Sequence, residues 1–385
     1  MRAGSSRAPV WTEETALTVA GSGPLARTVD VDGVAMSALV AEVAAPRAVV
    51  VALHGGAVTS GYFDQRVAPG QSLLQAGAAL GFTVIALDRP GYGASASRAG
   101  RGGFAGHGSH GSHGSHRSHG SHGSHGERMA SAAGRVDLGY GAIQALLAGR
   151  PRGAGVFLMA HSMGCLLAVQ MAADPRGAEL LGLEIAGIGL VPHPGAVTLM
   201  GALTEGSPPA DSLTAAGKAA DRAAGRAAEK TADRAAENVA VRGQASGTSP
   251  DQAGRDGAAR VPLRDLLWTP ASLYPPGAEA ALRLSASPGY EGSDVRGLSD
   301  AFPELAARVR VPVRYSLGDH ERVWSVGPAA LASIAALFTA APRVVTAEQR
   351  YAGHNLSLGR SALAYHLGVL SFAEECAVAR EITGG

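Results

Sequence analysis

A serine, a histidine and two carboxylates in this sequence stand where they could act together. Ser162 lies in the stretch AHSMG (160–164), between an apolar run and a second apolar stretch with helical spacing. His354 lies in a glycine-flanked segment near the C-terminus, and Asp319 and Glu321 precede it. A serine hydroxyl activated by an imidazole, which a carboxylate orients, is the arrangement used for acyl transfer.

The small residues around Ser162 fit a sharp turn from a strand into a helix. Such a turn lifts the serine side chain above the sheet edge, and small neighbours let strand and helix approach closely. Ala160 and Gly164 occupy the outer positions of the G-x-S-x-G pattern, with alanine in place of the first glycine. His161 then points away from the site if Ser162 points into it. Alternatively, Ser162 only caps the following helix.

Two backbone amides near Ser162 are candidates for binding a developing negative charge. The helix that begins at Met163 directs free N–H groups toward the space above Ser162. The glycines of HGG (54–56) let backbone N–H groups face a ligand without interference from a Cβ atom. We therefore expect the N–H groups of Met163 and Gly56 to form an oxyanion hole, although HGG by itself is also typical of a tight turn.

His354 is the candidate general base among the histidines. It follows the last expected strand and precedes the final expected helix, and Gly353 and Asn355 beside it indicate a loop. We expect Asp319 or Glu321, which follow another strand, to accept the Nδ1–H of this imidazole and to fix its tautomer. The residue types alone leave both carboxylates open.

The segments that must hold these residues alternate between strand-like and helix-like patterns. Strands are expected at 33–43, 48–54, 82–88, 155–160, 183–191, 311–318 and 343–348. Helices are expected at 71–80, 138–149, 164–173, 327–338 and 361–380. Several strands are continuous apolar runs, as in parallel strands covered on both faces. The pattern predicts an α/β fold with a mostly parallel, doubly wound sheet and sites at the C-terminal ends of the strands.

Two segments have compositions that do not suit a packed domain. Residues 97–127 hold a Gly-Ser-His repeat with seven of the thirteen histidines, and we expect a disordered insertion there. Such histidines could bind a transition metal, but without a rigid frame a solvated linker is the better interpretation. The alternation also stops at 193–300, which we expect to be an inserted cap with a low-complexity, Ala-rich segment at about 205–260. Residues 1–192 and 301–385 would then form the core.

The overall charge and composition exclude several classes of partner. The formal net charge is +1, from 33 basic and 32 acidic side chains, so neither nucleic acid nor a charged membrane surface is indicated. The two cysteines are typical of a reducing compartment. No apolar run reaches the length of a membrane span, and no leader pattern begins the sequence. We expect a soluble, cytoplasmic protein with a small-molecule substrate.

The catalytic candidates follow one another in the order serine, acid, histidine, as in the α/β-hydrolase fold family. Over residues 30–192 and 300–380 the chain resembles the capped serine hydrolases of that family. The resemblance rests on HGG, DRPGYGAS (88–95), AHSMG, the acid loop and GHN (353–355). The family's G-x-x-D-x-V pattern falls on 318–323 with Glu321 at the acid position. The resemblance therefore implies a catalytic triad of Ser162, Glu321 and His354, with Asp88 in a structural role.

The same resemblance implies an α/β-hydrolase fold with a helical cap after strand 6. It also implies that the protein is a carboxylic ester hydrolase, which needs no metal and no organic cofactor. A serine at the nucleophile position argues against haloalkane dehalogenases and epoxide hydrolases, whose elbow carries aspartate. The same triad could also serve a lyase, a perhydrolase or an acyltransferase. A non-catalytic binding protein of this fold and a metal-handling protein are the remaining alternatives.

Aromatic residues in and after the expected cap bear on the substrate. They are Trp268, Tyr274, Tyr290, Phe302 and Trp324. They suggest an apolar acyl or alcohol group, and they would equally form a small core of the cap itself.

Overall fold

The computed structural model describes residues 23–96, 125–197, 201 and 262–383. Most of the Gly-Ser-His insertion, 97–124, and the whole Ala-rich segment, 205–260, lie outside these residues, so the expectations for them stay predictions. The last residues of the insertion, 125–127, belong to helix α2 (His125–Ala130). Within the described residues, no helix combines the length and the apolar character that crossing a bilayer requires.

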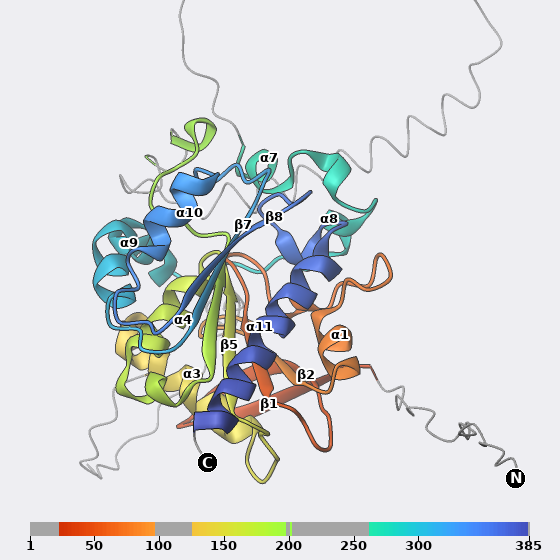
Figure 1. The fold of residues 1–385 in the computed structure, drawn as a ribbon, viewed down its shortest axis with the longest axis vertical. Coiled ribbons are helices and arrows are strands. Elements are labelled where there is room, and N and C mark those ends of the chain that lie inside the picture. The colour runs from red at the N-terminus through yellow and green to blue at the C-terminus, as the bar shows by residue number, and fades with distance from the viewer. Residues whose placement is uncertain (1–22, 97–124, 198–200, 202–261, 384–385) are drawn as a thin grey trace, which may run out of the picture.

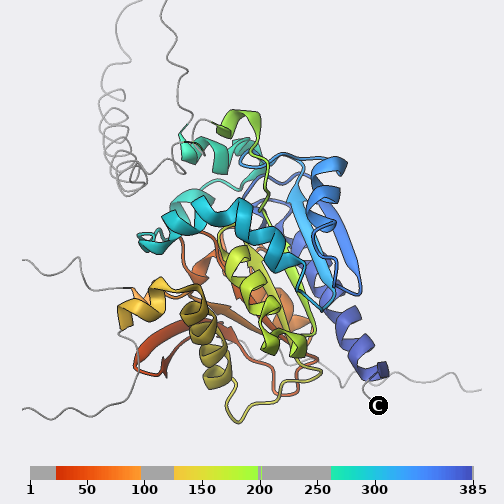
Figure 2. The ribbon, with the colours of Figure 1, turned by 90° about the vertical axis from the view of Figure 1, so that its left-hand side faces the viewer.

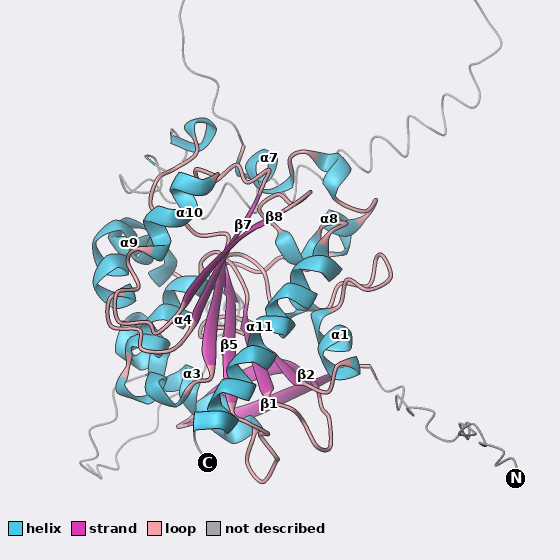
Figure 3. Cartoon of the chain, in the orientation of Figure 1, coloured by secondary structure: helices cyan, strands magenta, loops and turns pink. Residues whose placement is uncertain are grey.

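An eight-stranded sheet organises the chain (Figures 1 and 3). Its strands are β1 (Leu25–Val31), β2 (Val34–Ala41), β3 (Val49–Leu53), β4 (Thr83–Leu87), β5 (Val156–His161), β6 (Gly182–Ala186), β7 (Val313–Gly318) and β8 (Val344–Gln349). They lie in the order β1-β2-β4-β3-β5-β6-β7-β8. The β1–β2 and β2–β4 pairs are antiparallel and all other pairs are parallel. The predicted α/β fold with a mostly parallel sheet is confirmed.

Helices cover both faces of this sheet, which explains the continuous apolar runs of its central strands. The longer helices are α1 (Leu73–Ala79), α3 (Ala132–Leu146), α4 (Gly164–Ala173), α9 (Tyr290–Ala306), α10 (Pro328–Ala335) and α11 (Ala362–Thr383). Helices α1 and α11 lie on one face, whereas α3, α4, α9 and α10 lie on the other (Figure 1). Figure 2 shows α3, α4 and α9 in front of the strands.

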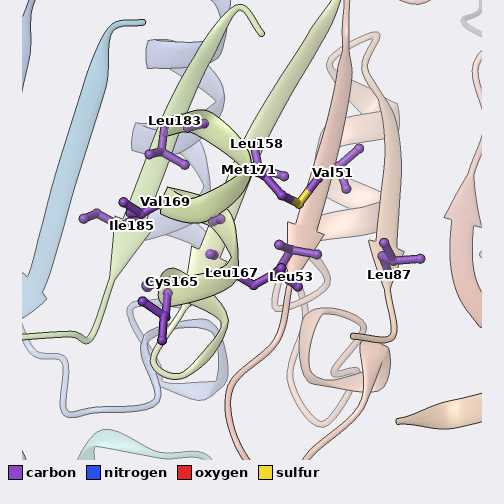
Figure 4. Packing of buried hydrophobic residues seen from close by; sticks show 14 of the residues in the cluster. Val51, Leu53, Leu87, Leu158, Cys165, Leu167, Val169, Met171, Leu183 and Ile185 are labelled. Atoms are coloured by element: carbon purple, nitrogen blue, oxygen red, sulfur yellow. The ribbon is translucent and has the colours of Figure 1, made fainter. Parts of the chain in front are cut away.

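Two hydrophobic cores result, one on each face. Alternate residues of β3 belong to different cores: Val51 and Leu53 pack toward α3 and α4, whereas Val50 and Ala52 pack toward α1 and α11. This division follows from the two-residue period of a strand. Figure 4 shows apolar side chains of α4, Val169 among them, against the central strands. The core therefore fixes α4, and with it the turn that precedes α4.

The structure differs from the sequence prediction mainly at the ends of elements. Strand β1 was not predicted, because most of its side chains are exposed and give no apolar pattern. Strand β6 ends at Ala186, well before the expected residue 191, since Gly187 adopts a left-handed φ of +65°. Helix α3 begins at Ala132, six residues before its expected start, where the Ser131 side chain accepts a hydrogen bond from the Gly134 N–H.

Helices also follow β6, where the cap was expected. The described part of this region contains α7 (Leu263–Trp268), α8 (Ala278–Ala281) and α9. The expected boundary between residues 300 and 301 falls inside α9. Since Leu298 and Phe302 of α9 belong to the core on the α4 face, this helix also covers the sheet.

Candidate active site

Ser162, His354 and Glu321 form one chain of hydrogen bonds. The Oγ atom of Ser162 lies 3.1 Å from Nε2 of His354, although 192 residues separate the two in sequence. Nδ1 of the same ring lies 2.8 Å from Oε2 of Glu321. Because a carboxylate only accepts hydrogen bonds, Nδ1 carries the ring proton and Nε2 is free to accept the serine proton. The structure thus brings together the three side chains that the sequence singled out.

The backbone at Ser162 holds this side chain in place. The residue lies between the end of β5 and the start of α4, with φ at +51°, a region that residues other than glycine rarely adopt. Its N–H donates to the carbonyl oxygen of Ala186 in the neighbouring strand, at 2.8 Å. The N-cap of α4 is Met163, without a side-chain cap, so the interpretation of Ser162 as only a helix cap is wrong.

Gly164 is required by a close approach of two backbones. A Cβ atom at this position would lie 2.5 Å from the carbonyl oxygen of His54 and 2.6 Å from that of Leu53. Neither backbone atom can move without shifting β3. The methyl group of Ala160, in contrast, is fully buried in the core, which explains why alanine replaces the first glycine of the pattern.

Replacing Gly164 by alanine should therefore destabilise the protein. We expect the free energy of unfolding to fall by about 1–3 kcal/mol, the usual cost of overpacking. Gly297→Ala is the matched control, because a Cβ atom on this helical glycine would meet no atom of the described residues within 4 Å, and helix propensity should stabilise that variant by up to about 1 kcal/mol. Chemical denaturation measures both, and equal stability of the two variants would contradict the steric argument.

Glu321 and Asp319 have different environments. Glu321 is 2% exposed, and its Oε1 also accepts the N–H groups of Arg322 and Val323, at 2.9 and 2.7 Å. Asp319 instead lies 2.7 Å from Nδ1 of His320 and accepts the Ala352 N–H at 3.0 Å. Of the two carboxylates that sequence analysis left open, Glu321 is the one in contact with His354.

The HGG loop lies directly against the serine turn. A Cβ atom on Gly55 would lie 3.2 Å from Cβ of Ser162, and one on Gly56 would lie 3.5 Å from Cγ of Met163. Ser162, Met163 and Gly56 are partly exposed, whereas Gly55 is buried. Among the described residues, no acceptor is hydrogen-bonded to the N–H of Gly56 or of Met163. Gly56 therefore lies against Met163 of the serine turn, and neither predicted amide has a hydrogen-bond acceptor within the described residues.

His161 makes no hydrogen bond to the Ser162 hydroxyl among the described residues, and its ring centroid lies 5.0 Å from that of His354. Its ring stacks on Tyr62 at a centroid distance of 4.6 Å. Its Nε2 lies 2.8 Å from the carbonyl oxygen of His354, which can only accept, so Nε2 carries the proton. Burial lowers the pKa of His161, which keeps the ring neutral. His161 thus ties the nucleophile turn to the loop of the candidate base.

A group of buried residues packs against the HGG loop and was not predicted from the sequence. Nη2 of Arg89 donates to the carbonyl oxygen of Gly55 at 2.8 Å and pairs with Glu291 of α9. The Arg89 N–H donates to Nε2 of His54 at 3.1 Å. The signal in the sequence was a charged residue, Arg89, two positions after the apolar run of β4. Asp88 accepts hydrogen bonds from Ser37 and Ser60, as its expected structural role requires.

Most of the five aromatic residues are engaged in the fold itself. Phe302 and Trp324 belong to the core on the α4 face. The hydroxyl groups of Tyr274 and Tyr290 donate to backbone carbonyls. Trp268 is partly exposed and meets Tyr274 edge-on at 4.9 Å between ring centroids. Of the five, Trp268 and Tyr290 are partly exposed, whereas Tyr274, Phe302 and Trp324 are buried.

Metal-ligating groups do not gather near this site. Within the part of the chain that the structure describes, no three histidine, cysteine, aspartate or glutamate side chains approach one another closely enough to hold an ion. All but one of the repeat histidines lie outside that part, so the structure does not describe their geometry.

Comparison with known proteins supports the fold without supplying a family model. No protein-family model matches the chain, and no curated protein matches it. A thermostable carboxyl esterase from Bacillus coagulans is 16% identical with a TM-score of 0.52, over 92% of this chain and 99% of the esterase. A monoacylglycerol lipase from Paleococcus ferrophilus is 15% identical with a TM-score of 0.49, over 89% and 99% of the two chains. At this identity, the likeness to the esterase shows the fold alone.

Proposed function

Starting from its α/β-hydrolase fold, we propose that this protein is a serine hydrolase that cleaves an ester-like bond in a small-molecule substrate. The observation that carries the proposal is the hydrogen-bonded chain from Ser162 through His354 to Glu321. Three residues from separate segments meet in the geometry of nucleophilic catalysis. In this proposal they are the nucleophile, the general base and the orienting acid.

The reaction begins with a proton transfer from the Ser162 hydroxyl to Nε2 of His354. The serine oxygen then attacks the substrate carbonyl, and the imidazolium gives the proton to the leaving alcohol. Glu321 stabilises the imidazolium and keeps Nδ1 protonated throughout. A water molecule, activated by the same imidazole, attacks the acyl-enzyme and releases the acid, which regenerates the free serine.

The carbonyl oxygen becomes negative in both steps and needs hydrogen-bond donors. Met163 follows Ser162 directly and Gly56 lies against Met163, and the N–H groups of both residues have no acceptor within the described residues. We assign them to the oxyanion hole. Donors fixed by the backbone in this way need no reorganisation during the reaction, and each contributes about 3 kcal/mol in enzymes of this kind.

A chain-length series of p-nitrophenyl esters, from acetate to decanoate, tests this function. We expect turnover by the wild-type protein, with a preference for longer acyl chains if the exposed face of Trp268 contributes an apolar surface. A fluorophosphonate probe should add to the peptide that contains Ser162, as mass spectrometry would show. Hydrolysis in H₂¹⁸O should place solvent oxygen in the acid, which an acyltransferase or a lyase would not do. Absence of both turnover and labelling would favour a non-catalytic binding protein.

A further inference from the structure

The carbonyl oxygen of Gly55 accepts two hydrogen bonds from buried side chains. Nδ1 of His54 and Nη2 of Arg89 each lie 2.8 Å from it. The tautomer of His54 follows from its other nitrogen, because Nε2 receives the Arg89 N–H and must offer a lone pair. The ring proton is therefore on Nδ1, which donates to Gly55. Burial lowers the pKa of His54, which keeps the ring neutral and this pattern fixed.

This carbonyl belongs to the same peptide unit as the N–H of Gly56. A donor on the oxygen of an amide draws electron density away from its nitrogen, so the N–H becomes a stronger donor. A guanidinium has a larger effect than a neutral donor because the bond is assisted by charge. Two donors also fill both lone pairs of the oxygen and fix the plane of the peptide. The direction of the Gly56 N–H is thereby set by side chains behind the loop.

Helix α9 holds the guanidinium in position. Arg89 is 2% exposed and pairs with Glu291, which lies 202 residues further along the chain. A Cβ atom on Gly56 would lie 3.3 Å from Oε2 of Glu291, so this carboxylate is also near the loop. Alone, its negative charge would oppose an oxyanion, and the paired guanidinium offsets that charge.

We propose that Arg89 and His54 are positioning residues that orient and polarise the Gly55–Gly56 peptide so that the Gly56 N–H binds the oxyanion strongly. Arg89 acts through the peptide and does not touch the substrate. The inference rests on the proposed function, because it assigns a task to the oxyanion hole of that reaction. It adds that α9, through Glu291, supports the hole from behind.

The test compares Arg89→Met with a matched variant, Arg135→Met. Arg135 is also a buried arginine, 3% exposed, that pairs with an acid of α9, Asp294, but it does not contact the HGG loop. Loss of a whole oxyanion donor costs roughly 100- to 1000-fold in kcat, so its weakening in Arg89→Met should cost about tenfold or more. KM for p-nitrophenyl butyrate should change less than about twofold, since ground-state binding is not affected.

Inhibition by a trifluoromethyl ketone distinguishes a role in the oxyanion hole from a merely structural one. The ketone forms a hemiketal oxyanion on the serine, so its inhibition constant should rise in Arg89→Met by the same factor by which kcat falls. Arg89→Lys should recover part of kcat and part of the affinity for the ketone, because an ammonium can still donate to the Gly55 carbonyl oxygen. In Arg89→Met the carboxylate of Glu291 is left without its partner, and the double variant Arg89→Met/Glu291→Gln removes that charge. Its kcat should stay as low as that of Arg89→Met, because the donor to Gly55 is still missing.

The outcomes separate this inference from the proposed function. If the wild-type protein hydrolyses esters and Arg89→Met resembles Arg135→Met, the inference is overturned and the function stands. Full recovery in the double variant would also overturn it, because the defect would then come from the isolated charge of Glu291. If the wild-type protein shows neither turnover nor labelling at Ser162, both proposals fall together.

Discussion

Replacing Ser162 by alanine is expected to lower kcat for p-nitrophenyl butyrate by about 10⁵-fold or more, the loss seen when a nucleophilic serine is removed from a triad. Without Oγ no acyl-enzyme forms, and only the amides of Gly56 and Met163 remain to assist direct attack by water. Steady-state kinetics on the purified variant measures the loss. Fluorophosphonate labelling should disappear in parallel.

The fold should not change in this variant. The turn is held by the N–H of Ser162, which donates to Ala186, and by its carbonyl oxygen, which accepts the Cys165 N–H at 2.9 Å. Alanine retains both backbone groups, so the unfolding midpoint should stay within a few degrees of the wild type. A variant that unfolds at the normal temperature and keeps more than a tenth of the activity would show that another group is the nucleophile.

The serine turn was predictable because its determinants are local. An apolar strand, a small-residue turn and an apolar helix follow one another within 156–173, and α4 occupies the predicted 164–173. The central strands were found for the same reason, since strands buried on both faces leave continuous apolar runs. Strand β1 lies at the sheet edge with exposed side chains, and no such pattern marks it.

The support behind the HGG loop could not be predicted, because it joins segments that are distant in sequence. Arg89 follows β4 and Glu291 lies in the first turn of α9, 202 residues later, and neither stretch carries a periodic signal that pairs them. A single acidic residue at the start of a helix usually faces solvent, where its charge interacts favourably with the helix dipole. Only the packing of α9 on the α4 face brings Glu291 to a buried arginine.

The choice between the two acidic residues depended on the path of one loop. After β7 the chain turns back, with the Glu321 N–H donating to the carbonyl oxygen of Gly318 at 3.1 Å. The turn places the first carboxylate, Asp319, near exposed His320 and the second, Glu321, in the interior beside His354. Residue types do not encode this difference, which is why only the resemblance to a known pattern favoured Glu321.

The second large effect is therefore expected for Glu321→Gln, with Asp319→Asn as its matched control two residues away. Glutamine keeps the shape of the side chain but can offer an amide N–H to Nδ1, which then has to accept. The ring proton moves to Nε2, and His354 can no longer take the proton of Ser162. In a serine protease the corresponding change lowers kcat about 10⁴-fold through the wrong tautomer, and we expect a loss of about 10³- to 10⁴-fold here.

Asp319→Asn should keep kcat within about threefold of the wild type, because among the described residues Asp319 makes no hydrogen bond to Ser162 or His354. Its hydrogen bonds go to His320 and to the Ala352 N–H, and an asparagine oxygen can still accept them. Steady-state kinetics on both variants, with the same ester, decides the assignment. A larger loss in Asp319→Asn than in Glu321→Gln would mean that the loop rearranges during the reaction and that Asp319, not Glu321, orients the imidazole.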